Sequence, residues 1–114
     1  MTTRRGFTLI ETVFAIFVFS VGALGFAATT ATVLRSLAVA GARERSARIA
    51  AARLEILRSQ GCAAQSGSEL KQGFQSEWTA SPGAAGMSVL ERVTYTTASG
   101  VRTDSYAAFL PCAR

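Results

Sequence analysis

The 114-residue chain contains no histidine, only two prolines, and two cysteines, Cys62 and Cys112. Without histidine it lacks the commonest general base and metal ligand, and two thiols alone make a poor zinc site. No C-x-x-C spacing or nucleophile–base pair is present either. The acidic residues of the second half form no paired-carboxylate pattern: Glu69, Glu77, Glu91 and Asp104. We therefore expect no catalytic residues, no metal site and no cofactor, and so no enzyme.

Charged residues are missing from one long stretch, residues 12–34. The apolar run of residues 7–34 is long enough to cross a bilayer, which needs about 20 apolar residues. Arg4 and Arg5 precede this run, and the positive-inside rule keeps such residues in the cytoplasm. The pattern predicts a short basic leader over residues 1–6 and places the chain beyond the apolar run outside the inner membrane.

A single carboxylate, Glu11, stands at the head of the apolar run. Insertion scales assign about 2.5 to 3.5 kcal/mol to the comparable aspartate at membrane depth. A plain membrane anchor leaves Glu11 unexplained. A secretory signal peptide cleaved near Ala27-Ala28 would have a shorter apolar core, of about 7 to 15 residues, without a carboxylate. A Glu11 close enough to the interface to reach water would need no partner, and this alternative stays open.

One helix is predicted to continue to about Ser59, because no proline interrupts residues 7–59 and Gly61 is suited to a C-cap. Its second part, residues 35–60, is amphipathic. The apolar stripe comprises Ala47, Ala50, Ala51, Leu54 and Leu57. The many arginines of this part alternate with alanine, leucine and glutamate, as on a solvated helix face. We therefore expect no nucleic-acid partner.

The remaining residues, 61–114, predict a small sheet domain. Residues 60–73 are rich in Gly, Ser and Gln and indicate a loop. Alternating or β-branched runs predict strands over Phe74–Thr79, Ser88–Thr97 and Val101–Leu110. The fold class is α+β, a long N-terminal helix packed on an antiparallel sheet of about three strands, with one further short strand left open. The core is expected to contain the aromatic residues Trp78, Tyr95, Tyr106 and Phe109, and a contact surface formed by them is the alternative.

The two cysteines predict one disulfide, Cys62–Cys112, in an oxidising compartment. It would join the end of the helix to the last residues of the chain. Closing a loop of about 50 residues stabilises a domain by roughly 4 kcal/mol in the chain-entropy estimate. Two unpaired buried thiols are the alternative.

The heptapeptide Arg5-Gly6-Phe7-Thr8-Leu9-Ile10-Glu11 resembles the leader junction of type IV pilins and of type II secretion pseudopilins. The apolar segment, the amphipathic helix and the small sheet follow in the order of that family. The resemblance implies that a prepilin peptidase cuts after Gly6 and that Phe7 becomes an N-methylated terminus. It also implies that the segment from Phe7 onward is first a membrane anchor and then part of a filament core.

The chain departs from the family pattern in the middle of this segment. Many members carry a proline slightly beyond the position of Gly22 and Gly25, where this chain has Ala27-Ala28. A break of the helix at proline is therefore not implied. The two glycines would permit either local melting or close packing of helices, and both interpretations stay open.

The resemblance implies a role for Glu11 as well. In the family, the glutamate of an incoming subunit is thought to meet the terminal amine of a neighbour and to set the axial register. The expected function is that of a non-enzymatic minor pilin or pseudopilin. The chain would cross the inner membrane once, with a cytoplasmic N-terminus and a periplasmic sheet domain, and would later become part of a filament. Its partners would be other pilin subunits, prepilin peptidase, the inner-membrane assembly platform and membrane lipid. The alternative is a single-span membrane protein whose periplasmic domain binds a partner without any filament.

Overall fold

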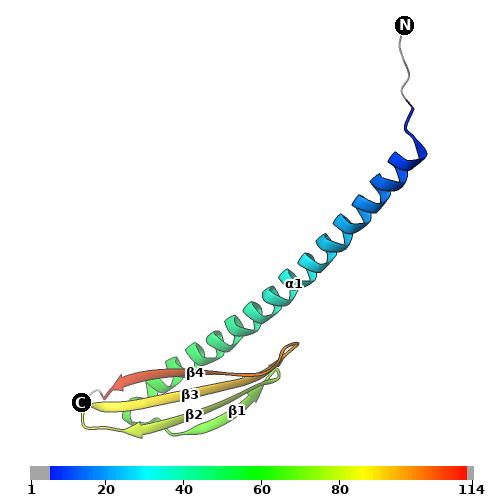
Figure 1. Cartoon of the computed structure of the whole chain (residues 1–114). Coiled ribbons are helices and arrows are strands. Elements are labelled where there is room, and N and C mark those ends of the chain that lie inside the picture. The colour runs from blue at the N-terminus through cyan, green and yellow to red at the C-terminus, as the bar shows by residue number, and fades with distance from the viewer. Residues whose placement is uncertain (1–5, 113–114) are drawn as a thin grey trace. The chain divides into compact units, whose positions relative to one another are not determined.

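The computed structural model describes residues 6–112 of the chain, so Arg4 and Arg5 of the predicted leader lie outside the described residues. The long helix α1 spans Leu9–Gln60, and a short 3-10 helix, η1, follows at Gly61–Ala63 (Figure 1). Four strands complete the fold: β1 Gly67–Lys71, β2 Phe74–Pro82, β3 Gly86–Thr97 and β4 Gly100–Pro111.

The four strands form one antiparallel sheet in the order β1-β2-β3-β4. The predicted α+β class is confirmed, but the sheet has a fourth strand where the sequence indicated a loop over residues 60–73. The hairpin between β1 and β2 turns at Gln72 and Gly73, whose φ angles are 51° and 83°. Positive φ at both positions is the type I′ geometry that two-residue hairpins favour. The Gln-Gly turn lacks the asparagine or aspartate that usually precedes glycine in such hairpins. Strand β1 also lacks β-branched residues, so the sequence signal for this hairpin was weak.

The end of α1 agrees with the prediction. The helix ends at Gln60, and Gly61 follows with a φ of 57°, the left-handed conformation of a C-cap glycine. The chain divides into two compact units between Ser36 and Leu37. In the first unit, every residue described, from Gly6 onward, is exposed in the isolated chain.

The core of the second unit lies between α1 and one face of the sheet (Figure 1). Its first cluster contains Leu57, Ala64, Met87, Val89 and Leu110, and its second contains Ala50, Phe74, Val93 and Tyr95. The predicted helix stripe was only partly right, because Ala47 and Ala51 are exposed. The helix turns the side of Ser46, Ala50 and Leu57 toward the sheet instead.

The expectation that all four aromatic side chains lie in the core was also partly wrong. Tyr95 is buried, and Trp78 and Tyr106 pack against the two clusters. Phe109 is 55% exposed because β4 alternates its side chains, so the buried Leu110 and its neighbour Phe109 point to opposite faces.

The predicted disulfide is present between Cys62 in η1 and Cys112 after β4, with the two Cα atoms 5.3 Å apart. Gly86, the first residue of β3, packs closely against the end of β4 beside this disulfide. A Cβ on Gly86 would lie 2.3 Å from the backbone oxygen of Leu110. Only glycine allows the two strands to meet there without a shift.

One acidic side chain, Glu91 on β3, is fully buried between the sheet and α1. Ser76 donates a hydrogen bond of 2.5 Å to Glu91 Oε1, while Oε2 has no hydrogen-bond partner among the described residues. Burial raises the pKa of Glu91, and the Ser76 hydrogen bond and the positive charge of Arg53 lower it in part. This burial was not predicted from the sequence, although Glu91 alternates in phase with Val89 and Val93 along β3.

The raised pKa of Glu91 predicts a pH-dependent stability. Because the folded pKa lies above the unfolded value of 4.5, the folded state binds this proton more tightly. The stabilisation is complete below that value and is lost as pH rises through the folded pKa. Glu91→Gln should flatten the stability curve and raise the free energy of unfolding at pH 7 by about 1 to 3 kcal/mol.

This prediction can be checked by urea unfolding of the full chain in detergent between pH 4 and pH 8. The exposed Glu77 on β2 supplies the matched control, Glu77→Gln. An unchanged pH dependence in the Glu91→Gln variant would contradict the assignment.

Candidate functional site at the start of the apolar helix

Thr8 and Glu11 close the N-terminus of α1 by bonding to each other. The backbone N–H of Thr8 donates to Glu11 Oε2 at 3.2 Å, and the backbone N–H of Glu11 donates to Thr8 Oγ1 at 3.3 Å. This reciprocal arrangement is a capping box, with Thr8 at the N-cap and Glu11 three residues later. This capping box was not predicted from the sequence, although T-x-x-E is its usual sequence signature.

The capping box places the carboxylate of Glu11 at the positive end of the helix dipole. Phe7 directly precedes the capped residue, and Gly6 and Phe7 both lie outside the helix and are exposed. Among the described residues, nothing lies within 4 Å of the position that a Cβ on Gly6 would occupy. Packing against residues 7–112 therefore gives no reason for glycine at this position.

The first part of the helix that follows carries mostly apolar side chains on its surface. Phe14, Phe17 and Leu24 are each more than three-fifths exposed in the isolated chain. Its hydroxyl groups bond to the carbonyl oxygens four residues earlier: Thr12, Ser20, Thr29, Thr30 and Thr32. The segment therefore exposes apolar side chains while its polar side chains are satisfied internally, as a lipid environment requires.

α1 contains a stretch long and apolar enough to cross a membrane. A Cβ on Gly22 or Gly25 would have no neighbouring atom of the described residues within 4 Å. Local melting of the helix and close packing against another helix therefore both stay open as roles for these glycines.

The other predicted site residues belong to the second unit of the chain. Cys62 and Cys112 form the disulfide described above. Within residues 6–112, no three His, Cys, Asp or Glu side chains gather as a metal site would require. Besides Thr8, sequence reasoning missed Arg53, which pairs with Glu69 and lies over the ring of Trp78.

Comparison with known proteins bears on the first part of the chain. Residues 1–27 match the family described as "Prokaryotic N-terminal methylation motif". No curated protein and no solved structure matches the chain. The match spans Gly6, Phe7 and Glu11 together with most of the apolar run. The predicted resemblance is therefore confirmed in this segment: residues 1–27 carry the signal motif of type IV pilins and pseudopilins.

Proposed function

We propose that this chain is a non-enzymatic structural subunit of a type IV filament, either a minor pilin or a type II secretion pseudopilin. The observation that carries the proposal is the uncovered apolar helix with a single carboxylate in the capping box at its head. Burying apolar surface is worth about 25 cal/mol per Å², so this helix favours a lipid bilayer or the core of an assembly over water.

Processing follows from the matched motif. A prepilin peptidase cuts after Gly6, and the new terminus, Phe7, is methylated. The exposed backbone around Gly6 and the absence of any packing need for glycine support recognition by an enzyme. The chain then spans the inner membrane once, with its start in the cytoplasm and the sheet domain in the periplasm. The Cys62–Cys112 disulfide is consistent with that oxidising compartment.

Assembly uses the same carboxylate. Cleavage creates a cationic amine on Phe7, and the amine of a neighbouring subunit neutralises Glu11 when the helix leaves the bilayer for the filament core. A buried charge is tolerated only when it is paired, so this contact fixes the axial register of the incoming subunit. The assembly platform of the inner membrane and other pilin subunits complete the set of partners.

The proposal can be tested by shearing filaments from cells that carry or lack prepilin peptidase. The chain should appear in the sheared fraction only when the peptidase is present, together with other pilin subunits. Recovery of the chain in the membrane fraction alone, in cells that make filaments, would favour the alternative of a single-span protein with a periplasmic partner. The integrity of the filaments themselves serves as the internal control.

A further inference from the structure

A groove runs between the last turns of α1 and strand β1. It consists of three adjoining hollows of about 480, 160 and 340 Å³. The first and second share Arg53 and Ile56, and the second and third share Ile49, Ala52 and Lys71. The Arg53–Glu69 ion pair joins α1 to β1 where the first two hollows adjoin, and we call the three hollows together the α1–β1 groove.

The floor of the α1–β1 groove is a second apolar stripe of the helix. Ile49, Ala52 and Ile56 are spaced i, i+3 and i+7 and therefore lie on one side of α1. They flank the stripe that packs on the sheet, and Ile56 remains 48% exposed. An exposed isoleucine in a hollow is available to a partner rather than to the core of this chain.

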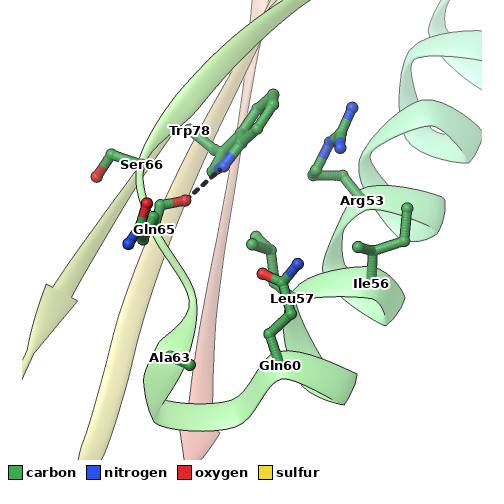
Figure 2. Close-up of a pocket in the computed structure, with 8 residues that line it drawn as sticks. All are labelled: Arg53, Ile56, Leu57, Gln60, Ala63, Gln65, Ser66 and Trp78. Carbon is green, nitrogen blue, oxygen red and sulfur yellow. Dashed lines mark hydrogen bonds between the residues drawn. The ribbon is translucent and has the colours of Figure 1, made fainter.

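The hollow of about 480 Å³ is the largest of the three, and Figure 2 shows the residues that line it. Trp78 Nε1 donates a hydrogen bond of 2.9 Å to the backbone oxygen of Gln65. The guanidinium carbon of Arg53 lies 4.0 Å from the centre of the Trp78 ring, and the same guanidinium pairs with Glu69. These contacts hold the aromatic face in place, so a partner would meet a largely preformed surface.

The rim of the groove is positively charged. The exposed Arg45, Arg48 and Lys71 line it. Arg53 is largely buried and pairs with Glu69, the acidic residue among the lining side chains. Arg48 and Arg53 have ion-pair partners, whereas no ion pair engages Arg45 or Lys71 within the described residues. A basic rim around an apolar floor is complementary to an amphipathic segment with acidic side chains.

Among its described residues, a second copy of this chain offers no cluster of unpaired acidic side chains to such a groove. Five of its seven acidic residues are engaged or buried: Glu44, Glu55 and Glu69 in ion pairs, Glu91 in the core, and Asp104 in a hydrogen bond from Tyr95. Of the other two, Glu11 heads the apolar helix, and Glu77 lies opposite Arg92 across the β2–β3 pairing. Without Arg4 and Arg5 of the leader, the net side-chain charge falls from +5 to +3, which still disfavours contact between copies through a basic surface.

We propose that the α1–β1 groove binds an acidic amphipathic segment of a different filament subunit. This inference rests on the proposed function and adds the chemistry of the neighbour. The apolar side of that segment lies on Ile49, Ile56 and Trp78, and its carboxylates face Arg45 and Lys71. The chain then enters a filament beside an acidic subunit rather than beside itself.

Trp78 is the one tryptophan of the sequence and lines the groove, so its fluorescence reports occupancy. The full chain in neutral detergent is titrated at low salt with a tryptophan-free amphipathic peptide, leucine on one side and glutamate on the other. The expected result is a saturable shift of Trp78 emission. The same peptide with lysine in place of glutamate should give none.

Two charge reversals on the same helix localise the binding. Arg45→Glu, at the groove, should weaken binding of the acidic peptide about fivefold, which corresponds to the upper value of about 1 kcal/mol for one exposed ion pair. Arg58→Glu changes the charge equally but lies outside the groove lining, and it should change binding less than about twofold.

Three results would overturn the proposal: equal shifts by both peptides, equal weakening by both variants, or saturation by a DNA oligonucleotide or by phosphatidylglycerol vesicles but not by the acidic peptide. None of these results touches the processing of Phe7, so the proposed function would stand or fall separately.

Discussion

Replacement of Glu11 by alanine should leave membrane insertion and cleavage intact and reduce incorporation into filaments at least about tenfold. A carboxylate at membrane depth costs about 2.5 to 3.5 kcal/mol on insertion scales, and 1.4 kcal/mol corresponds to a factor of ten. Removing the carboxylate lowers the cost of placing the helix in lipid. It also removes the group that pairs with the Phe7 amine of a neighbouring subunit. The measurement is the ratio of sheared to membrane-bound chain by quantitative immunoblot.

The capping box makes a second variant informative. Glu11 bonds to Thr8 within its own chain, so Glu11→Ala removes both the cap and the charge. Glutamine also completes a capping box, and Glu11→Gln therefore preserves the helix start while abolishing the charge. The charge-pairing account predicts that the glutamine variant assembles as poorly as the alanine variant.

Thr8→Ala supplies the complementary control, because it removes the cap and keeps the carboxylate. A typical cap is worth about 1 kcal/mol, so this variant should assemble much better than either Glu11 variant. Normal assembly of Glu11→Gln combined with loss in Thr8→Ala would reassign the role of Glu11 to the helix start.

The second large effect concerns the disulfide. The double variant Cys62→Ser/Cys112→Ser should lower the free energy of unfolding of the sheet domain by roughly 4 kcal/mol, as the chain-entropy estimate for a separation of 50 residues gives. The unit is small, and single domains are stable by only about 5 to 15 kcal/mol, so most of its stability would be lost.

Urea unfolding of the full chain in detergent, followed by Trp78 fluorescence, measures this loss. Treating the unchanged chain with a reducing agent should move the unfolding midpoint to that of the double variant. A double variant whose midpoint stays within the error of the unchanged chain would show that packing of η1 and β4 alone holds this end of the domain. The disulfide would then be dispensable.

The sequence was most informative where one physical signal dominated. Unbroken helical periodicity without proline predicted α1 to within a residue at its end, and Gly61 marked the cap. Strand β1 was not predicted because its five residues include no β-branched side chain. It pairs with β2 through a turn at Gln72 and Gly73, and that turn depends on their backbone conformation. Which side of α1 meets the sheet was misjudged since alanine is compatible with either face of a helix.

The candidate site was predictable in its motif and less so in its geometry. Gly6, Phe7 and Glu11 stand adjacent in the sequence, so a local pattern sufficed to identify them. The burial of Glu91 depends on how the sheet covers α1. The α1–β1 groove joins side chains from Arg45 to Trp78, and only the fold brings them together.

The measurement that tests the central claim most directly is the mass of the mature N-terminal peptide, from cells with and without prepilin peptidase. We predict a peptide that begins at Phe7, carries an N-methyl group and depends on the peptidase. An intact terminus at Met1 in both cells would make the chain an ordinary membrane anchor, and a start near residue 29 would make it a secreted protein. Either result would contradict the filament subunit proposed above.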